Sequence, residues 1–323
     1  MTAPSQGFRR LALATVVATF LLVILGGLVR VSDSGLGCGP GGSGFHGWPM
    51  CNGDVVPGAD LNTVVEYSHR TVASIVGLMA LSLFVLAWRR HRHLLLSTGV
   101  VFGGVVFEGL LGAATVEENL DPPLVAAHLG TAMLILGALL YIWRATREDE
   151  PVETDRGFRR LAVTTQVFVW LTIVAGGYMA GTQHYGRPDY QLGDGAHHAC
   201  GREFPTCNGD FLPFGDARLV DIHLTHRVLM YVTSVLVIWL AVAALRRGSR
   251  ALSLNAWALL GVLAVQILVG ALNVWLEEYE ALIVLHLGLG TALWMAASWM
   301  TMQLYRVPVP EHEAVDRREL VAA

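Results

Sequence analysis

The sequence predicts an all-α polytopic membrane protein in which eight transmembrane helices form two pseudo-symmetric four-helix bundles. Hydrophobic residues make up 54% of the 323 residues and charged residues only 15%, whereas soluble domains carry about a quarter charged residues. The apolar residues are gathered into eight long runs, and landmarks of the first half recur in the second half. These three observations indicate a protein embedded in the lipid bilayer, and no nucleic-acid partner is expected.

Each apolar run is long enough to cross the hydrocarbon core, about 30 Å thick, as a single helix. The expected spans are 10–29, 64–88, 94–116, 122–143, 160–181, 220–245, 252–275 and 281–304.

Arginine placement predicts the orientation. Arginine clusters fall in alternate connections, at 9–10, 89–92, 144–160, 246–250 and 306–318, and few arginines lie in the other connections. By the positive-inside rule both termini are predicted to be cytoplasmic in the plasma membrane. The long loops at 30–63 and 182–219 then face outward.

The repeated landmarks predict a duplication. FRRLA occurs at 8–12 and again at 158–162, and WPMCNGD at 48–54 corresponds to FPTCNGD at 204–210. SHR at 68–70 corresponds to THR at 225–227, and HLGTA from His128 to HLGLGTA from His286. Each half contains an even number of spans, so the pseudo-two-fold axis is expected along the membrane normal. The expected units are a bundle over 1–145, a cytoplasmic linker over 146–159, a second bundle over 160–305 and a cytoplasmic tail over 306–323.

Four histidines stand at matching positions, each about six residues inside the outer end of an even-numbered span: His69, His128, His226 and His286. A single intramembrane histidine is often only hydrogen-bonded to a neighbouring helix. Four that match in both repeat and depth favour a functional site. Two facing imidazoles in each bundle suit one metal, since bundles build cofactor sites from facing helices. Structural zinc needs four ligands, whereas haem iron needs two, so haem is favoured.

The other histidines and the cysteines lie outside the spans. His46, His91, His93, His184, His197, His198 and His312 are expected to be solvated residues of loops, turns and tail. Cys38 with Cys51, and Cys200 with Cys207, fall two and two into the outward loops, where an oxidising environment favours disulfides. Stapling of a long loop is the simpler role for these pairs, and redox activity is the alternative.

Several motifs together resemble the haem A synthase family. They are LGGLVRVSDSGLGC, GWPMCNG, EYSHR and HLGTA in the first half, and CGREFPTCNG, THR and HLG in the second half. The resemblance covers residues 8 to 304 and agrees with a fold of eight helices in two bundles. The spacing between Cys38 and Cys51 is wider than the family's usual spacing.

The resemblance implies an activity and a set of site residues. The expected enzyme is a membrane oxidoreductase that oxidises the C8 methyl group of haem O to a formyl group, giving haem A for cytochrome oxidase. It implies that His69 and His128 bind the substrate haem, that His226 and His286 ligate the iron of a haem b, and that Glu66 is essential. The first bundle is then the catalytic half and the second the haem b half.

One charged position breaks the repeat. Glu66 precedes His69 by three residues and shares its helical face, whereas the counterpart of Glu66 is His223. Our hypothesis is that Glu66 manages protons or stabilises developing positive charge during methyl oxidation. The alternative is a structural carboxylate that pairs with arginine.

Further polar residues also match across the repeat. Arg70 and Arg227 are candidates for haem propionates, because a guanidinium recognises carboxylates in a bidentate manner; pairing with a loop or helix is the competing interpretation. Glu108 and Gln266 are candidates for supporting the histidines.

The expected partners are haem O, haem O synthase as a candidate, an electron donor that no motif identifies, and the cytochrome oxidase assembly process. Two other functions compete. The first is a diheme b-type membrane electron carrier, against which the unique carboxylate Glu66 argues. The second is a haem-binding transporter or chaperone, which predicts labile haem and no new pigment.

Overall fold

The structure, a computed structural model, describes residues 4–147, 150–183, 195–277 and 280–306. Its long helices are α1 Gln6–Val31, α2 Leu61–Arg90, α3 Leu95–Glu117, α4 Pro122–Ala145, α5 Arg156–Gly181, α6 Arg218–Leu245, α7 Arg250–Trp275 and α8 Glu280–Met302, with short 3₁₀ turns at Gly44–His46 (η1), Arg92–Leu94 (η2) and Ala196–His198 (η3). Within these ranges, eight helices are long and apolar enough to cross a membrane. The predicted all-α multi-pass membrane class is therefore confirmed.

Several helices begin earlier than the apolar runs suggest, because a polar residue caps them; α2 and α5 are examples. Asp60 accepts a hydrogen bond from the backbone N–H of Thr63 at 3.3 Å, so α2 starts at Leu61. Asp155 accepts one from Phe158 at 2.9 Å at the start of α5. Such caps satisfy N–H groups that a helix leaves unpaired in its first turn.

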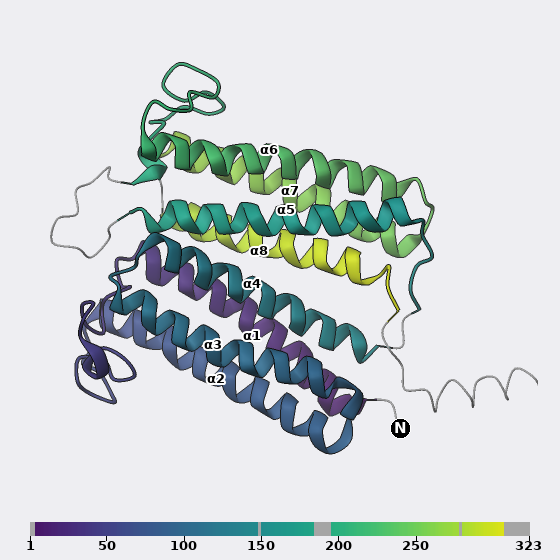
Figure 1. Cartoon of the computed structure of the whole chain (residues 1–323), viewed down its shortest axis with the longest axis horizontal. Helices are drawn as coiled ribbons and strands as arrows, with labels where there is room; N and C mark the ends of the chain where they lie inside the picture. The colour runs from purple at the N-terminus through teal and green to yellow at the C-terminus, as the bar shows by residue number, and fades with distance from the viewer. Residues whose placement is uncertain (1–3, 148–149, 184–194, 278–279, 307–323) are drawn as a thin grey trace, which may run out of the picture.

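The helices of each half contact one another in a closed ring. In the first half α1 contacts α2, α2 contacts α3, α3 contacts α4 and α4 contacts α1; α5 to α8 repeat this pattern. The halves meet through α1 with α8, α4 with α5 and α4 with α8, and Figure 1 shows α4 and α5 side by side. Consequently α2 and α3, like α6 and α7, lie away from the contact between halves.

Two tryptophans of the second half anchor α4 of the first half. Trp170 donates its indole N–H to the carbonyl oxygen of Gly130 at 2.9 Å, and Trp294 donates to that of Met133 at 2.8 Å. A buried indole N–H needs such a partner. These bonds add direction to an interface of apolar side chains.

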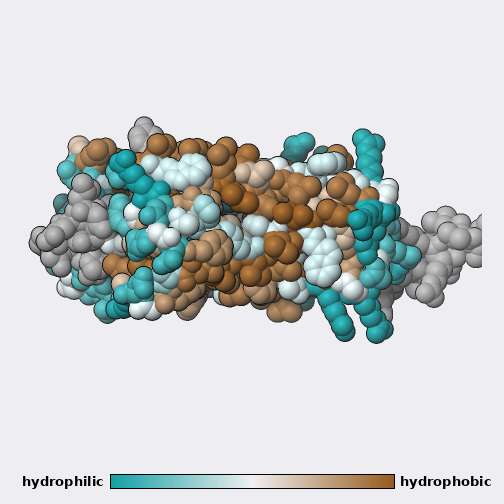
Figure 2. Space-filling view, turned by 90° about the horizontal axis from the view of Figure 1, so that it is seen from above, coloured by the Kyte–Doolittle hydropathy of each residue, from teal (hydrophilic) through white to brown (hydrophobic). Residues whose placement is uncertain are grey.

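Both cysteine-containing loops lie at one end of the molecule. We call residues 32–60 the first cysteine loop and residues 195–217 the second. In Figure 1 they extend at the left, whereas the N-terminus lies at the right. Figure 2 shows an apolar middle band between hydrophilic ends, the distribution expected of a bilayer-spanning protein.

The two cysteine loops share a turn. In each, CNGD forms a bridge between the first and last residue of the motif. Asn52 and Gly53 have φ of 54° and 86°, and Asn208 and Gly209 have 52° and 91°. Positive φ at two successive residues is typical of the turn that Asn-Gly favours.

Candidate functional site

Each of the four histidines packs against a glycine of the preceding helix. A methyl group added to Gly26, Gly112, Gly176 or Gly270 would lie 3.1, 3.1, 3.0 or 2.9 Å from Cε1 of His69, His128, His226 or His286 respectively. These distances are shorter than ordinary carbon–carbon contacts. We call the four glycines the histidine seats, because only the absence of a side chain there lets the Cε1 edge of each imidazole approach the neighbouring helix this closely.

The ring nitrogens have different surroundings. Nδ1 of His226 lies 3.1 Å from the carbonyl oxygen of Thr172. Nδ1 of His128 lies 3.0 Å from Oε1 of Glu108, although the two groups are not aligned for a hydrogen bond. Nδ1 of His69 and of His286 is buried, with no hydrogen-bond partner among the described residues.

The supporting residues on α3 and α7 differ in charge. Nε2 of Gln266 lies 3.3 Å from Nε2 of His286, whereas its counterpart in the repeat, Glu108, lies beside Nδ1 of His128. The first half therefore has a carboxyl group where the second half has a neutral amide.

Glu66 is buried and joins α2 to the first cysteine loop. One carboxylate oxygen accepts the backbone N–H of Cys38 at 2.8 Å, and the other pairs with Arg70. Its counterpart His223 is also buried, and its Nδ1 lies 2.7 Å from the carbonyl oxygen of Ala196 in the second cysteine loop. The structure thus shows the arginine pairing of the alternative hypothesis, and the catalytic role of Glu66 stays a prediction.

Arg70 and Arg227 both bind carbonyl groups of the cysteine loops. Arg70 donates to Gly47 at 2.6 Å and to Met50 at 3.0 Å. Arg227 donates to Thr206 at 2.8 Å and to Glu203 at 2.7 Å. Arg70 and Arg227 also line the cavity that contains the four histidines. Their contact with haem propionates stays a prediction.

All four histidines line one cavity of about 1010 Å³ that extends through both halves. Its wall is mostly apolar, with the polar groups Glu66, Glu108 and Gln266 among the lining residues. A large apolar cavity with a few convergent polar groups is the usual form of a ligand site.

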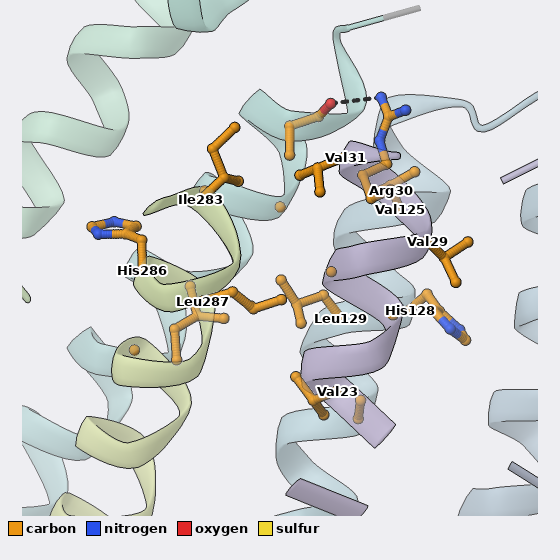
Figure 3. Close-up of a pocket in the computed structure, with 18 of the residues that line it drawn as sticks. Val23, Val29, Arg30, Val31, Val125, His128, Leu129, Ile283, His286 and Leu287 are labelled. Atoms are coloured by element: carbon orange, nitrogen blue, oxygen red, sulfur yellow. Dashed lines mark hydrogen bonds between the residues drawn. The ribbon is translucent and has the colours of Figure 1, made fainter. Parts of the chain in front are cut away.

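Two leucine–glycine contacts separate the histidine pairs where the halves meet. Leu129 follows His128 and would lie 3.1 Å from a methyl group on Gly177; Leu287 follows His286 and would lie 2.6 Å from one on Gly27. Figure 3 shows Leu129 and Leu287 between the two labelled histidines, whose rings point away from each other into their own halves.

The two halves are also joined at the cavity's end near the cysteine loops. Arg30 of α1 donates to the carbonyl oxygen of Ala180 at 2.7 Å and also to that of Gln183, the first of which is the dashed bond in Figure 3.

Burial, with neighbouring cationic groups, holds the pKa of His197 in the second cysteine loop well below its ordinary value. His197 also lines the cavity.

Both disulfides are present, Cys38–Cys51 and Cys200–Cys207. The longer segment between the first pair contains η1, and the chain returns to it where the backbone N–H of Gly53 donates to the carbonyl oxygen of His46 at 2.9 Å. Each disulfide closes the loop that Arg70 or Arg227 holds to its helix.

The expectation that every other histidine is solvated is wrong for His197, which lines the cavity, and for His91. This side chain is only 3% exposed, and its ring packs edge-on against Phe8 at 4.8 Å. The turn between α2 and α3 folds back under the start of α1, and burial lowers the pKa of His91. His184 and His312 lie outside the described residues.

The helix starts also modify the predicted depth of the histidines. His69 and His226 follow the first residue of their helices by eight positions, whereas His128 and His286 follow theirs by six. Each histidine therefore matches its counterpart in the other half. The two histidines of one half, however, lie at different positions from the starts of their helices, so their equal depth in the membrane does not follow from helix position alone.

The residues fit a haem in each half. Two axial imidazoles in an apolar surround can hold a haem, and each half contributes two histidines to the mostly apolar lining of the cavity. The seats hold each ring by its edge against the preceding helix, and all four histidines line the cavity, so the rings are positioned for a group inside it. Sequence reasoning did not identify the seats, although their recurrence before each histidine was a signal.

Comparisons with known proteins identify the family of the chain. Residues 9–298 match the cytochrome oxidase assembly protein family. Among curated relatives, "Heme A synthase" of Alkalihalophilus pseudofirmus is 28% identical over 92% of this chain and 96% of its own length. The proteins of that name from Symbiobacterium thermophilum and Shouchella clausii are 30% and 29% identical, over 91% and 76% of this chain and 94% and 80% of theirs. The chain belongs to the cytochrome oxidase assembly protein family.

Proposed function

We propose that this protein is a haem A synthase, an oxidoreductase that converts the C8 methyl group of haem O to a formyl group. The observation that carries the proposal is a cavity lined by two histidine pairs, with Glu66 beside only one of them. The names of the relatives support the same activity.

We assign the halves different tasks. Residues 1–145 would hold the substrate haem O between His69 and His128, and residues 160–305 would hold haem b between His226 and His286. Bound there, haem b would supply one-electron redox chemistry. The linker is assigned to 146–159. The tail is assigned to 306–323, and all of it after residue 306 lies outside the described residues.

The chain's own residues would prepare the substrate for oxidation. The seats Gly26 and Gly112 fix the edges of the two rings that bind the substrate, and Glu108 lies beside the second ring. The apolar wall of the cavity excludes water. Glu66 holds the first cysteine loop through the N–H of Cys38 and presents a carboxyl group that can accept a proton or stabilise positive charge.

The orientation and partners follow from the same assignment. The arginine clusters support cytoplasmic termini in the plasma membrane, which puts the disulfides on the oxidising side. Haem O synthase and an electron donor are the proposed partners in supplying cytochrome oxidase.

Co-expression with a source of haem O, followed by extraction of the haems, tests the proposal. Conversion to haem A, or to the hydroxymethyl product, is expected. A stable protein with two haems and no new pigment would instead identify an electron carrier. Haem that is readily lost, again without conversion, would identify a transporter or chaperone.

A further inference from the structure

The cavity does not reach the surface equally in the two halves. Along α2 and α6 its lining residues correspond one to one: Glu66 and His223, His69 and His226, Arg70 and Arg227, Ala73 and Met230, Val76 and Thr233, Gly77 and Ser234. Ser74 alone breaks this pattern. It lines the cavity and is exposed, whereas its counterpart Tyr231 does not line it.

The same difference occurs on α3 and α7. Val106 and Leu110 line the cavity although they are 50% and 56% exposed, whereas their counterparts Ala264 and Leu268 do not line it. In the first half the cavity therefore continues between α2 and α3 to the surface that faces lipid.

Gly109 on α3 also leaves space between α2 and α3. A methyl group on Gly109, which is exposed and lines the cavity, would meet nothing within 4 Å. Its counterpart is Ile267, a half-buried side chain. We call Ser74, Val106, Gly109 and Leu110 the α2–α3 window.

An aromatic side chain takes the corresponding place in the second half. Tyr231 is half-buried, and its ring stacks on Phe211 of the second cysteine loop with centroids 5.9 Å apart. Tyr231 and Ile267 thus occupy the two places where the first half has a serine and a glycine.

We propose that the α2–α3 window is the lateral passage by which haem O enters the first site from the bilayer and haem A leaves it. A haem is a largely apolar plate, so a passage lined by Val106 and Leu110 lets it reach His69 and His128 without crossing water. The window lies on the side of the bundle remote from the second half (Figure 1). The second half lacks the passage because its haem stays in place. This inference rests on the proposed function.

Two substitutions that install the second half's residues test the passage. Ser74→Tyr with Gly109→Ile is expected to slow the uptake of haem O by purified protein in lipid nanodiscs at least tenfold, measured by the absorbance change of the binding haem. The haem b content should be unchanged, which also shows that the variant is folded. Uptake at the wild-type rate would overturn the proposal.

Gly103→Ile is the matched control. Gly103 lies on the same helix, is exposed, has open space around its missing side chain and does not line the cavity. Its variant should take up haem O as the wild type does. If it slows uptake equally, bulk on α3 rather than closure of the window is responsible, and the passage is refuted.

The reciprocal change opens the second half. Tyr231→Ser with Ile267→Gly is expected to speed the loss of haem b to an excess of a haem-scavenging protein by at least tenfold; no change would contradict the sealing role of these residues. The outcome is independent of turnover. A wild type that takes up haem O through the window without oxidising it would refute the proposed function and leave the passage standing.

Discussion

Gly176 and His226 are packed so closely that a methyl group on the glycine would lie 3.0 Å from Cε1 of the imidazole. The same ring has its Nδ1 3.1 Å from the carbonyl oxygen of Thr172, one turn earlier on α5. One edge and one nitrogen of the ring are therefore fixed by a single helix, which leaves Nε2 for an axial bond.

Gly176→Ala should displace this ring and weaken the binding of haem b. Overpacking a filled site costs about 1–3 kcal/mol, which corresponds to a loss of affinity between about fivefold and about 150-fold. Haem content after purification, read from the absorbance spectrum, measures the effect. Gly261→Ala on α7, where a methyl group meets nothing within 4 Å, is the control and should keep its haem. Equal retention in both variants would show that the seat is not needed.

Gly112→Ala should affect the other site. A methyl group there would lie 3.1 Å from Cε1 of His128, so the binding of haem O should weaken while haem b is retained. Titration of purified protein with haem O distinguishes the two sites. Loss of haem b from this variant would contradict the assignment of the halves.

Glu108→Gln replaces the carboxyl group by the amide that the second half carries. A carboxylate beside a ligating histidine raises the basicity of the ring and favours the oxidised metal. The potential of haem bound in the first site should therefore rise, on the order of 60 mV for a tenfold change in equilibrium. Gln266→Glu should lower the potential of haem b. Redox titration followed by absorbance checks both, and unchanged potentials would limit Glu108 to packing.

Glu66→Gln separates charge from structure, because the amide oxygen can still accept the N–H of Cys38. Haem content should stay normal while formation of haem A falls about a hundredfold or more, the usual effect of losing an acid–base group. If this variant binds haem normally and still makes formylated product at the wild-type rate, Glu66 is only a structural partner of Arg70.

Asp155 should make the linker end of α5 sensitive to acid. The N–H of Phe158, and then Arg247, hold the pKa of this carboxyl below its ordinary value. The stabilisation is present above the unfolded-state pKa of about 3.9 and is lost as the pH falls through the lower folded-state value. Asp155→Asn keeps the cap but loses the ion pair, so its thermal unfolding between about pH 5 and pH 3 should depend less on pH than that of the wild type.

The sequence by itself determined the membrane class and the number of helices, because apolar runs of this length have no other stable state in lipid. It also determined the pairing of histidines across the repeat and the difference between Glu66 and His223. Each of these depends on residue type and spacing along one helix.

Only the tertiary structure decided which residues lie against the histidines. The seats, the approach of Glu108 to His128 and the contacts of Leu129 and Leu287 all join different helices, and their distances depend on how those helices rotate and pack. The same holds for the burial of His91 and for the window at Ser74 and Gly109. A side chain's period along its own helix fixes its face, but the neighbouring helix decides whether that face meets a glycine, a carboxyl group or open lipid.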